Sequence, residues 1–223
     1  FENKKTFVIA ESGINHNGSE KIAKKLIESA FETGANAVKF QTYITKNLVT
    51  KNAELAFYQR KNLNLNNQSQ MLKKFELSKE IFKRLKKYAD KLGIIFLSSP
   101  FDLESAEFLI KNLKLKIIKI PSGEITNAPL LNFIGKNSKK IILSTGMSNF
   151  KEIYQGLDIL AFSMIRKQNP NKLNFLGYFK KFNKNYFFKD KIILMHCISE
   201  YPTDLNNINL LRINKLKKIF KLE

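Results

Sequence analysis

The sequence predicts an α/β fold with a parallel sheet or barrel, on the basis of two observations. Short apolar runs each stop at a cluster of polar residues, and longer segments of helical character separate these runs. Such alternation of buried strand and amphipathic helix is typical of parallel α/β folds, whose ligands bind beyond the carboxyl ends of the strands. The six runs are FVIAE ending at Glu11, AVKFQ at Gln41, IIFLSSP at Ser99, IIKIPSGE at Glu124, IILSTG at Thr145 and IILMHCISE at Glu200.

Each apolar run is expected to form a strand, and each helical segment a helix that covers the sheet. Gly34 and Gly93 follow two of these segments and are expected to end the helices. The long connection over residues 42–70, with its Asn-rich NLNLNNQS stretch, is expected to be a loop. The expected strands are 7–11, 37–41, 94–98, 117–120, 141–144 and 191–196, and the expected helices are 20–33, 78–92, 104–113, one including 130–135, 149–164 and one at the end of the chain.

These elements amount to about six β/α units, whereas a TIM (β/α)8 barrel needs eight over roughly 250 residues. The chain ends inside an amphipathic helical pattern. We therefore expect a TIM barrel truncated after about six units, with an open sheet as the alternative. No internal boundary is visible, and residues 1–223 are expected to form a single, incomplete barrel domain.

Composition predicts a soluble, cytoplasmic protein. The chain has 223 residues, 43% of them hydrophobic, and no apolar run approaches the roughly 18–20 residues of a membrane helix. No secretory leader is visible, and the single cysteine, Cys197, cannot form an internal disulfide. We therefore expect no membrane partner.

The formal net charge of +20 raises the possibility of nucleic-acid binding. The lysines are spread along nearly every helix, however, as expected for solvated outer faces, and no nucleic-acid motif is present. We therefore expect no nucleic-acid partner. The basic and aromatic segment 166–190 could stack on bases or lie on an anionic surface, but packing of its aromatics against the barrel wall is the preferred interpretation.

Two lysines lie inside apolar strands, Lys39 in AVKFQ and Lys119 in IIKIPSGE. A buried ammonium is costly unless it meets an anion. If both lysines point toward one barrel mouth, they would form a binding site for a phosphate or carboxylate, with Ser98, Ser99 and Ser122 as neutral donors. Alternatively, each lysine reaches solvent or pairs with a carboxylate such as Glu11 or Glu124.

Other strand-end residues leave more than one interpretation open. Glu11 can act as a general base or as a structural counter-ion. His16 and His196 both follow strand ends, but two histidines make an incomplete metal site and most single histidines are only hydrogen-bonded. Gly123 and Gly146 suggest sharp turns or close approach of the backbone to a ligand.

Six motifs in a common order resemble the sialic acid synthases, the family of N-acetylneuraminate, legionaminate and pseudaminate synthases, along nearly the whole chain. They are AESGINHNG (10–18), AVKFQTY (37–43), SSPFD (98–102), KIPSGE (119–124), STGM (144–147) and HCISEYPT (196–203).

The resemblance implies a phosphoenolpyruvate-dependent transferase that forms a carbon–carbon bond. It would condense phosphoenolpyruvate with an N-acetylated amino-sugar aldehyde, giving a nine-carbon 2-keto sugar acid and phosphate for carbohydrate biosynthesis. A divalent metal, Mn2+ or Mg2+, would polarise the aldehyde. By motif correspondence, Glu11 and Glu124 are the catalytic candidates, Glu11 as acid/base or water-positioning group. The substrate-binding candidates are Lys39, Ser99, Lys119, Ser122 and Ser199 for phosphoenolpyruvate, and Gln41, Glu124 and Tyr201 for the sugar.

The chain also departs from the family pattern. Some relatives carry Thr at the position of Ser99 and Asn at that of Ser199, and the stretch 146–191 is longer than a plain loop and helix. The family's metal-binding GYSDHT motif and its C-terminal antifreeze-like domain, which completes a homodimer, would lie beyond Glu223. We therefore expect no metal ligands within this chain and no activity from it alone. A non-catalytic short form and a basic nucleic-acid-associated barrel are the alternatives.

Overall fold

The computed structural model describes residues 6–54, 67–166, 174–183, 186–200 and 203–222. Its contacts divide the chain into two compact units, residues 1–113 and 114–223. Each unit contains one three-stranded parallel sheet with strands in sequence order. The structure therefore confirms the α/β class and the parallel strands, but the described strands form two sheets and not a closed barrel.

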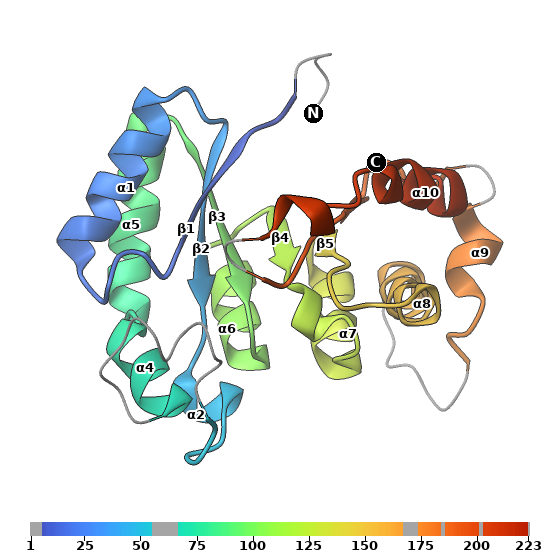
Figure 1. Cartoon of the computed structure of the whole chain (residues 1–223), viewed down its shortest axis with the longest axis horizontal. Coiled ribbons are helices and arrows are strands. Elements are labelled where there is room, and N and C mark those ends of the chain that lie inside the picture. The colour runs from blue at the N-terminus through green and yellow to red at the C-terminus, as the bar shows by residue number, and fades with distance from the viewer. Residues whose placement is uncertain (1–5, 55–66, 167–173, 184–185, 201–202, 223) are drawn as a thin grey trace. The chain divides into compact units, whose positions relative to one another are not determined.

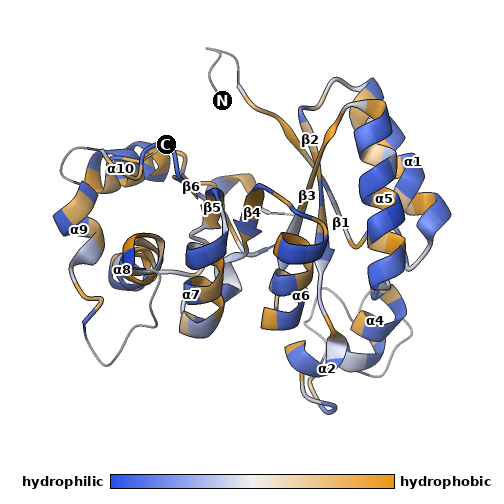
Figure 2. Cartoon of the chain, turned by 180° about the vertical axis from the view of Figure 1, so that it is seen from behind, coloured by the Kyte–Doolittle hydropathy of each residue, from blue (hydrophilic) through white to orange (hydrophobic). Residues whose placement is uncertain are grey.

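The first unit is a sheet with a helical layer on one face (Figure 1). Val38, Phe40 and Phe96 are buried on that face, and the rings of Phe40 and Phe96 stack with centroids 5.4 Å apart. The strands are β1 (Ile9–Gly13), β2 (Ala37–Thr42) and β3 (Ile95–Pro100), and the main helices are α1 (Glu20–Glu32) and α5 (Lys79–Leu92). Both helices present polar and apolar residues in Figure 2, as amphipathic helices must when they cover a sheet.

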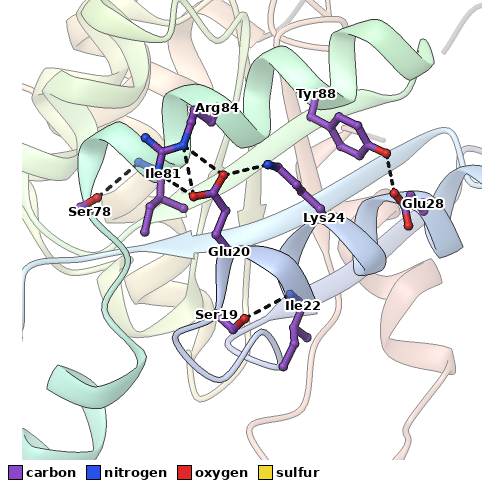
Figure 3. Close-up of polar contacts among 9 residues, drawn as sticks. All are labelled: Ser19, Glu20, Ile22, Lys24, Glu28, Ser78, Ile81, Arg84 and Tyr88. Atoms are coloured by element: carbon purple, nitrogen blue, oxygen red, sulfur yellow. Dashed lines mark hydrogen bonds and ion pairs between the residues drawn. The ribbon is translucent and has the colours of Figure 1, made fainter.

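Side chains on α1 and α5 join the two helices and fix their starts (Figure 3). Ser19 and Ser78 accept hydrogen bonds from the backbone N–H groups of Ile22 and Ile81 and so cap the two helices. Arg84 of α5 donates to both carboxylate oxygens of Glu20, at 2.6–3.1 Å. Hydrogen bonds from Arg84 and then Lys24 lower the pKa of Glu20 to about 2.

Further short helices follow β2 and β3 in the first unit. A small core of Tyr43, Met71, Leu72 and Phe75 joins the chain after β2 to α4. Asp102 caps the helix after β3 through the N–H of Ser105 and also accepts from the N–H of Ile44, so it joins the β2 and β3 loops. These elements are α2 (Thr45–Leu48), α4 (Gln68–Phe75), α6 (Leu103–Glu107) and a π-helical turn, η1 (Phe108–Asn112).

The second unit repeats the arrangement of parallel strands and helices. Asn149 and Glu152 cap α8 reciprocally, with each side chain accepting from the other's backbone N–H. The strands are β4 (Ile117–Ile120), β5 (Lys140–Ser144) and β6 (Ile192–Met195). The helices are η2 (Ser122–Glu124), α7 (Ala128–Asn137), α8 (Phe150–Arg166), α9 (Tyr178–Phe182), η4 (Leu205–Asn207) and α10 (Leu211–Phe220).

The aromatic segment 166–190 packs within the second unit where the structure describes it. Phe179 and Phe188 are buried, and their rings stack 5.7 Å apart. Asp158 of α8 accepts from the N–H groups of Gly177 and Phe179, both at 2.8 Å, which anchors the start of α9. This arrangement agrees with the packing interpretation for these residues. None of the described helices is long and apolar enough to cross a membrane.

Most predicted elements are observed, with three differences. The first strand is Ile9–Gly13 and not 7–11. The connection 42–70 was expected to be a loop, but it contains α2 and the start of α4, which Asn67 caps by accepting from the N–H of Gln70. The short helix α9 was also not predicted.

Candidate active site

In the first unit, Lys39 lies at the centre of a polar group on the face of the sheet opposite Val38 and Phe40. Its Nζ contacts the Glu11 carboxylate and donates to Ser99 Oγ at 3.5 Å. Lys39 is 8% exposed, whereas the side chain of Glu11 is 49% exposed, so a buried cation meets a carboxylate that solvent can reach. Of the two interpretations of Lys39, the structure therefore shows the one in which it pairs with the carboxylate of Glu11.

Strand register explains why these side chains meet. Glu11 pairs with Lys39 across β1 and β2, and Gln41 pairs with Ser99 across β2 and β3. Because side chains alternate along strands, all four belong to one face. A Cβ on Gly13 would lie 3.4 Å from Glu11 Oε1 and 3.8 Å from Gln41 Nε2, so both side chains lie over this glycine.

Ser98 does not join this group, although we expected it as a possible donor. Its hydroxyl lies 2.7 Å from the Thr42 hydroxyl, and both side chains are buried. Ser98 pairs with Phe40 across β2 and β3, so both side chains lie on the face covered by the helices. Ser98 therefore joins the ends of β2 and β3 and faces away from Lys39.

In the second unit, Lys119 lies at the start of a chain of polar contacts. It is 7% exposed, and its Nζ donates to the Ile120 carbonyl at 3.2 Å and contacts Ser144 Oγ. Ser144 Oγ lies 3.0 Å from the sulfur of Cys197. The contacts connect the ends of all three strands of this sheet.

Gly146 lies close to three oxygen atoms near these residues. A Cβ at this position would lie 3.2 Å from each of three oxygens, the carbonyl of Cys197 and the hydroxyls of Ser122 and Ser199. Such approaches are tighter than ordinary contacts, so only glycine fits without a shift. The hydroxyls of Ser122 and Ser199, two predicted phosphoenolpyruvate-binding residues, thus converge on Gly146, and the approach of a ligand to this glycine stays a prediction.

The structure gives fewer contacts for the other predicted site residues, Glu124 and Tyr201. Glu124 accepts a hydrogen bond from Asn127 Nδ2 at 2.6 Å, and Asn127 in turn caps α7 through the N–H of Leu130. This contact orients the carboxylate and leaves its catalytic role a prediction. Tyr201 lies outside the described residues.

The two histidines have different surroundings. His16 is 1% exposed, its Nδ1 accepts from the N–H of Gly18 at 3.1 Å, and burial lowers its pKa to about 4. Both ring nitrogens of His196 are buried without a hydrogen-bond partner among the described residues. Burial, and then the charge of Arg212, lower the pKa of His196. Across the described ranges, no group of three or more His, Cys, Asp or Glu side chains could hold a metal ion.

Our sequence interpretation missed Ser144 and Cys197 as members of the lysine group. The pairing of the strands contains the signal. Lys119 pairs with Ile142 of β5, and Ser144 lies two residues further on the same face; Ser144 pairs with Met195 of β6, and Cys197 lies two residues further again. Reading it required the register of three strands, which the sequence alone does not supply.

The sequence pattern of the NeuB family matches residues 26–223 of the chain. The chain is also 46% identical over 221 residues to N,N'-diacetyllegionaminic acid synthase of Campylobacter jejuni, which covers 99% of this chain. The chain belongs to the NeuB family. The resemblance to the sialic acid synthases is thereby confirmed.

More distant members of the NeuB family and its solved structures agree. Human N-acetylneuraminate-9-phosphate synthase is 28% identical over 217 residues, 96% of this chain. The N-acetylneuraminic acid synthetase of Leptospira borgpetersenii, solved in complex with citrate, superposes with a TM-score of 0.77 at 28% identity, over 98% of this chain and 63% of that one. The chain spans 59% of the Campylobacter synthase and 52% of the human one.

Proposed function

We propose that the protein condenses phosphoenolpyruvate with an N-acetylated amino-sugar aldehyde, either N-acetylmannosamine or a diacetamido hexose. The observation that carries the proposal is the pair of buried lysines within strands, each with a serine hydroxyl beside it, in a chain of the NeuB family. A doubly anionic substrate with a carboxylate and a phosphate suits two such cations.

The fold that we propose for the complete protein is a TIM barrel. Its support is the parallel order of strands in each unit and the superposition on the Leptospira synthetase. In a barrel, the carboxyl ends of all strands face one mouth. We therefore propose that the substrates of the complete protein bind at that mouth.

The reaction forms one carbon–carbon bond and breaks one carbon–oxygen bond. The methylene carbon of phosphoenolpyruvate attacks the aldehyde carbon, and the aldehyde oxygen becomes a hydroxyl after protonation. Water then adds to the cationic C2, and the tetrahedral intermediate expels phosphate to leave the 2-keto acid. The substrates and water thus balance the keto acid and phosphate.

The residues of this chain have roles in binding and proton transfer in the proposal. Lys39, Ser99, Lys119, Ser122 and Ser199 hold phosphoenolpyruvate. Gln41, Glu124 and Tyr201 face the sugar. Glu11, which contacts Lys39 and remains half exposed, is suited to accept a proton or to position the water.

A divalent metal, Mn2+ or Mg2+, belongs to the proposal only for the complete enzyme. The described residues do not fit a metal site, since no suitable cluster of ligands occurs among them. We assign no step of the chemistry to a metal held by these residues. A cytoplasmic homodimer completes the proposal.

The test is a phosphate-release assay of the full-length protein with phosphoenolpyruvate, Mn2+ and a panel of N-acetylated hexosamines. We expect phosphate release that depends on one sugar of the panel, with the nine-carbon acid detected by mass spectrometry. The 223-residue chain assayed alone is expected to show no release above background. Sugar-independent release would refute the condensation, and no release from the full-length protein would favour a non-catalytic role in ligand or partner binding.

A further inference from the structure

The four residues that follow Gln41 are each held by a residue distant in the sequence. Every contact is a hydrogen bond with a donor–acceptor distance of 2.6–3.1 Å. The partners are Phe101 for Thr42, Leu72 for Tyr43, Asp102 for Ile44 and Glu76 for Thr45. The loop after β2 is therefore fixed residue by residue, starting directly after a candidate sugar-binding residue.

Asp102 makes more contacts than the cap of a helix requires. It is 7% exposed, and its Oδ1 accepts from the N–H of Ser105 at 2.9 Å, which caps α6. Its Oδ2 accepts from the N–H of Ile44 at 3.0 Å and from the Ser105 hydroxyl at 2.7 Å. Ser19 and Ser78 cap α1 and α5 with one hydroxyl each, and burial of a carboxylate costs more than burial of a hydroxyl. The cap alone therefore does not account for an aspartate at this position.

Strand register connects the hydrogen bond between Ile44 and Asp102 to the candidate site. Gln41 pairs with Ser99 across β2 and β3, and their side chains belong to one face. Ile44 follows Gln41 by three residues, and Asp102 follows Ser99 by three. The hydrogen bond therefore joins the two loops three residues beyond the two candidate ligands. A shift of one loop against the other would change the spacing of Gln41 and Ser99.

We propose that Asp102 is a positioning residue that fixes the loop after β2 to the loop after β3 and thereby sets the spacing between Gln41 and Ser99. Glu76 supports the same loop at Thr45. The consequence for catalysis rests on the proposed function, in which Gln41 faces the sugar and Ser99 holds phosphoenolpyruvate. Asp102 then sets the distance between the two substrates without contacting either one.

The first test measures the loop directly, by hydrogen exchange of backbone amides in the full-length protein labelled with 15N-isoleucine. Ile44→Val removes the Ile44 signal and thereby assigns it. Asp102→Ser keeps a cap for α6 but has neither the second oxygen nor the length to reach Ile44, so we expect this amide to exchange about tenfold faster or more. Ser78→Ala, which removes the cap of α5 instead, should leave the rate unchanged. An unchanged rate in Asp102→Ser would overturn the proposal, whether or not the protein is a synthase.

The second test measures kcat, and KM for both substrates, in the same variants. Two reactants whose spacing has changed react more slowly although each still binds. We therefore expect Asp102→Ser to lower kcat roughly 30-fold and to change either KM by less than about threefold. Ser78→Ala should retain the wild-type kcat. A purely structural role of Asp102 would lower the melting temperature and leave kcat unchanged, and that result would overturn the proposal.

Glu76→Ala keeps the proposal testable if Asp102→Ser does not fold. It removes the acceptor of two hydrogen bonds, from the N–H and the hydroxyl of Thr45. We expect the Ile44 amide to exchange a few-fold faster and kcat to fall about tenfold. A Glu76→Ala protein with wild-type exchange and wild-type kcat would overturn the proposal.

The matched control for this variant is Glu107→Ala, because Glu107 forms an exposed pair with Lys111 four residues further along the chain. It should retain the wild-type exchange rate and kcat. Failure of the wild-type full-length protein to release phosphate would refute the proposed function alone, and the exchange rates would then decide the role of Asp102.

Discussion

Each of the two units buries a lysine within a strand, and the contacts described for the two lysines differ in chemistry. Lys39 and Lys119 are 8% and 7% exposed, so burial does not distinguish them. Lys39 contacts the carboxylate of Glu11 and the hydroxyl of Ser99, whereas Lys119 donates to the Ile120 carbonyl and contacts the Ser144 hydroxyl. A carboxylate balances the charge of an ammonium, while a carbonyl and a hydroxyl orient it without adding negative charge.

This difference matters for how each lysine can meet an anion. A ligand that approaches Lys39 also meets the negative charge of Glu11, which is half exposed. A ligand that approaches Lys119 meets the carbonyl of Ile120 and the hydroxyl of Ser144. We therefore expect the lysine of the first unit to depend on its acidic partner, and the lysine of the second unit to depend in part on its contacts with these two groups.

The largest effect is expected from replacing the lysines in the full-length protein. Lys39→Met leaves Glu11 as an uncompensated charge beside the substrate, so kcat/KM for phosphoenolpyruvate should fall roughly 1,000-fold, against roughly 100-fold for Lys119→Met. Steady-state kinetics measure both, and thermal unfolding should show little change. Lys83→Met, which removes an exposed pair with Glu80, is the control. Adding Glu11→Gln should recover part of the affinity lost in Lys39→Met but not in Lys119→Met; unchanged affinity in both lysine variants would remove the lysines from the site.

A second effect separates the two carboxylates. Glu11→Gln should retain phosphoenolpyruvate affinity and lower kcat about 100-fold, because the shape of the side chain remains while the proton acceptor is lost. A glutamine at position 124 can still accept the hydrogen bond from Asn127 Nδ2. If that hydrogen bond is the main contact of Glu124, Glu124→Gln should lower kcat less than Glu11→Gln does. Calorimetric binding and kcat together measure this. Near-normal turnover in both variants would reduce the two glutamates to counter-ions or structural groups.

Two glycines of the second unit give a third and smaller effect. Gly146→Ala places a methyl group 3.2 Å from three oxygens, so the groups that carry them must shift, and we expect roughly a tenfold rise in KM for phosphoenolpyruvate. Gly123→Ala is the matched control, since a Cβ there meets nothing within 4 Å. Gly13 of the first unit is a less direct test, because its positive φ of 52° strains any substitution whatever the space around it. Equal KM values in both variants would show that the substrate does not depend on the positions of the groups around Gly146.

The features of the two lysine sites that depend on a single strand could be predicted from the sequence. Alternation within AVKFQ and IIKIPSGE identified both lysines, and the runs of apolar residues located every strand to within about two residues. The shift of β1 to Ile9–Gly13 could not be predicted in this way, because a register irregularity between Glu11 and Gly13 extends the pairing with β2 beyond the apolar run.

What depends on several strands, or on tertiary packing, was not predictable. The contact of Lys119 with Ser144 joins residues 25 positions apart. Ser98 was wrongly expected in the site, because the face to which its side chain points depends on the register of β3 against β2. The helix α4 begins in an Asn-rich stretch that favours turns, but it forms because Met71, Leu72 and Phe75 pack around Tyr43. The single barrel domain expected from the sequence stays a prediction.

The smallest effect concerns pH and compares the two histidines. The ordinary histidine pKa is about 6.5, and burial lowers that of His16 to about 4, so folding favours the neutral ring. The stability that depends on neutral His16 is therefore present above about pH 6.5 and is lost as the pH falls toward 4. At about pH 5.5 this amounts to about 1 kcal/mol relative to neutral pH. Urea unfolding at the two pH values should show that loss in the wild type and a smaller one in His16→Gln.

His196 tests whether the response belongs to the first unit alone. Its pKa is also lowered by burial and by Arg212, so His196→Gln should reduce the pH dependence in the same direction. The two rings differ in their contacts, since Gly18 donates to His16 whereas both nitrogens of His196 are buried without a partner among the described residues. Replacing His196 should therefore cost little stability at neutral pH, whereas His16→Gln should cost the contact with Gly18. An unaltered pH dependence in His16→Gln would show that the ring is protonated at its ordinary pKa and that the loop after β1 opens to solvent.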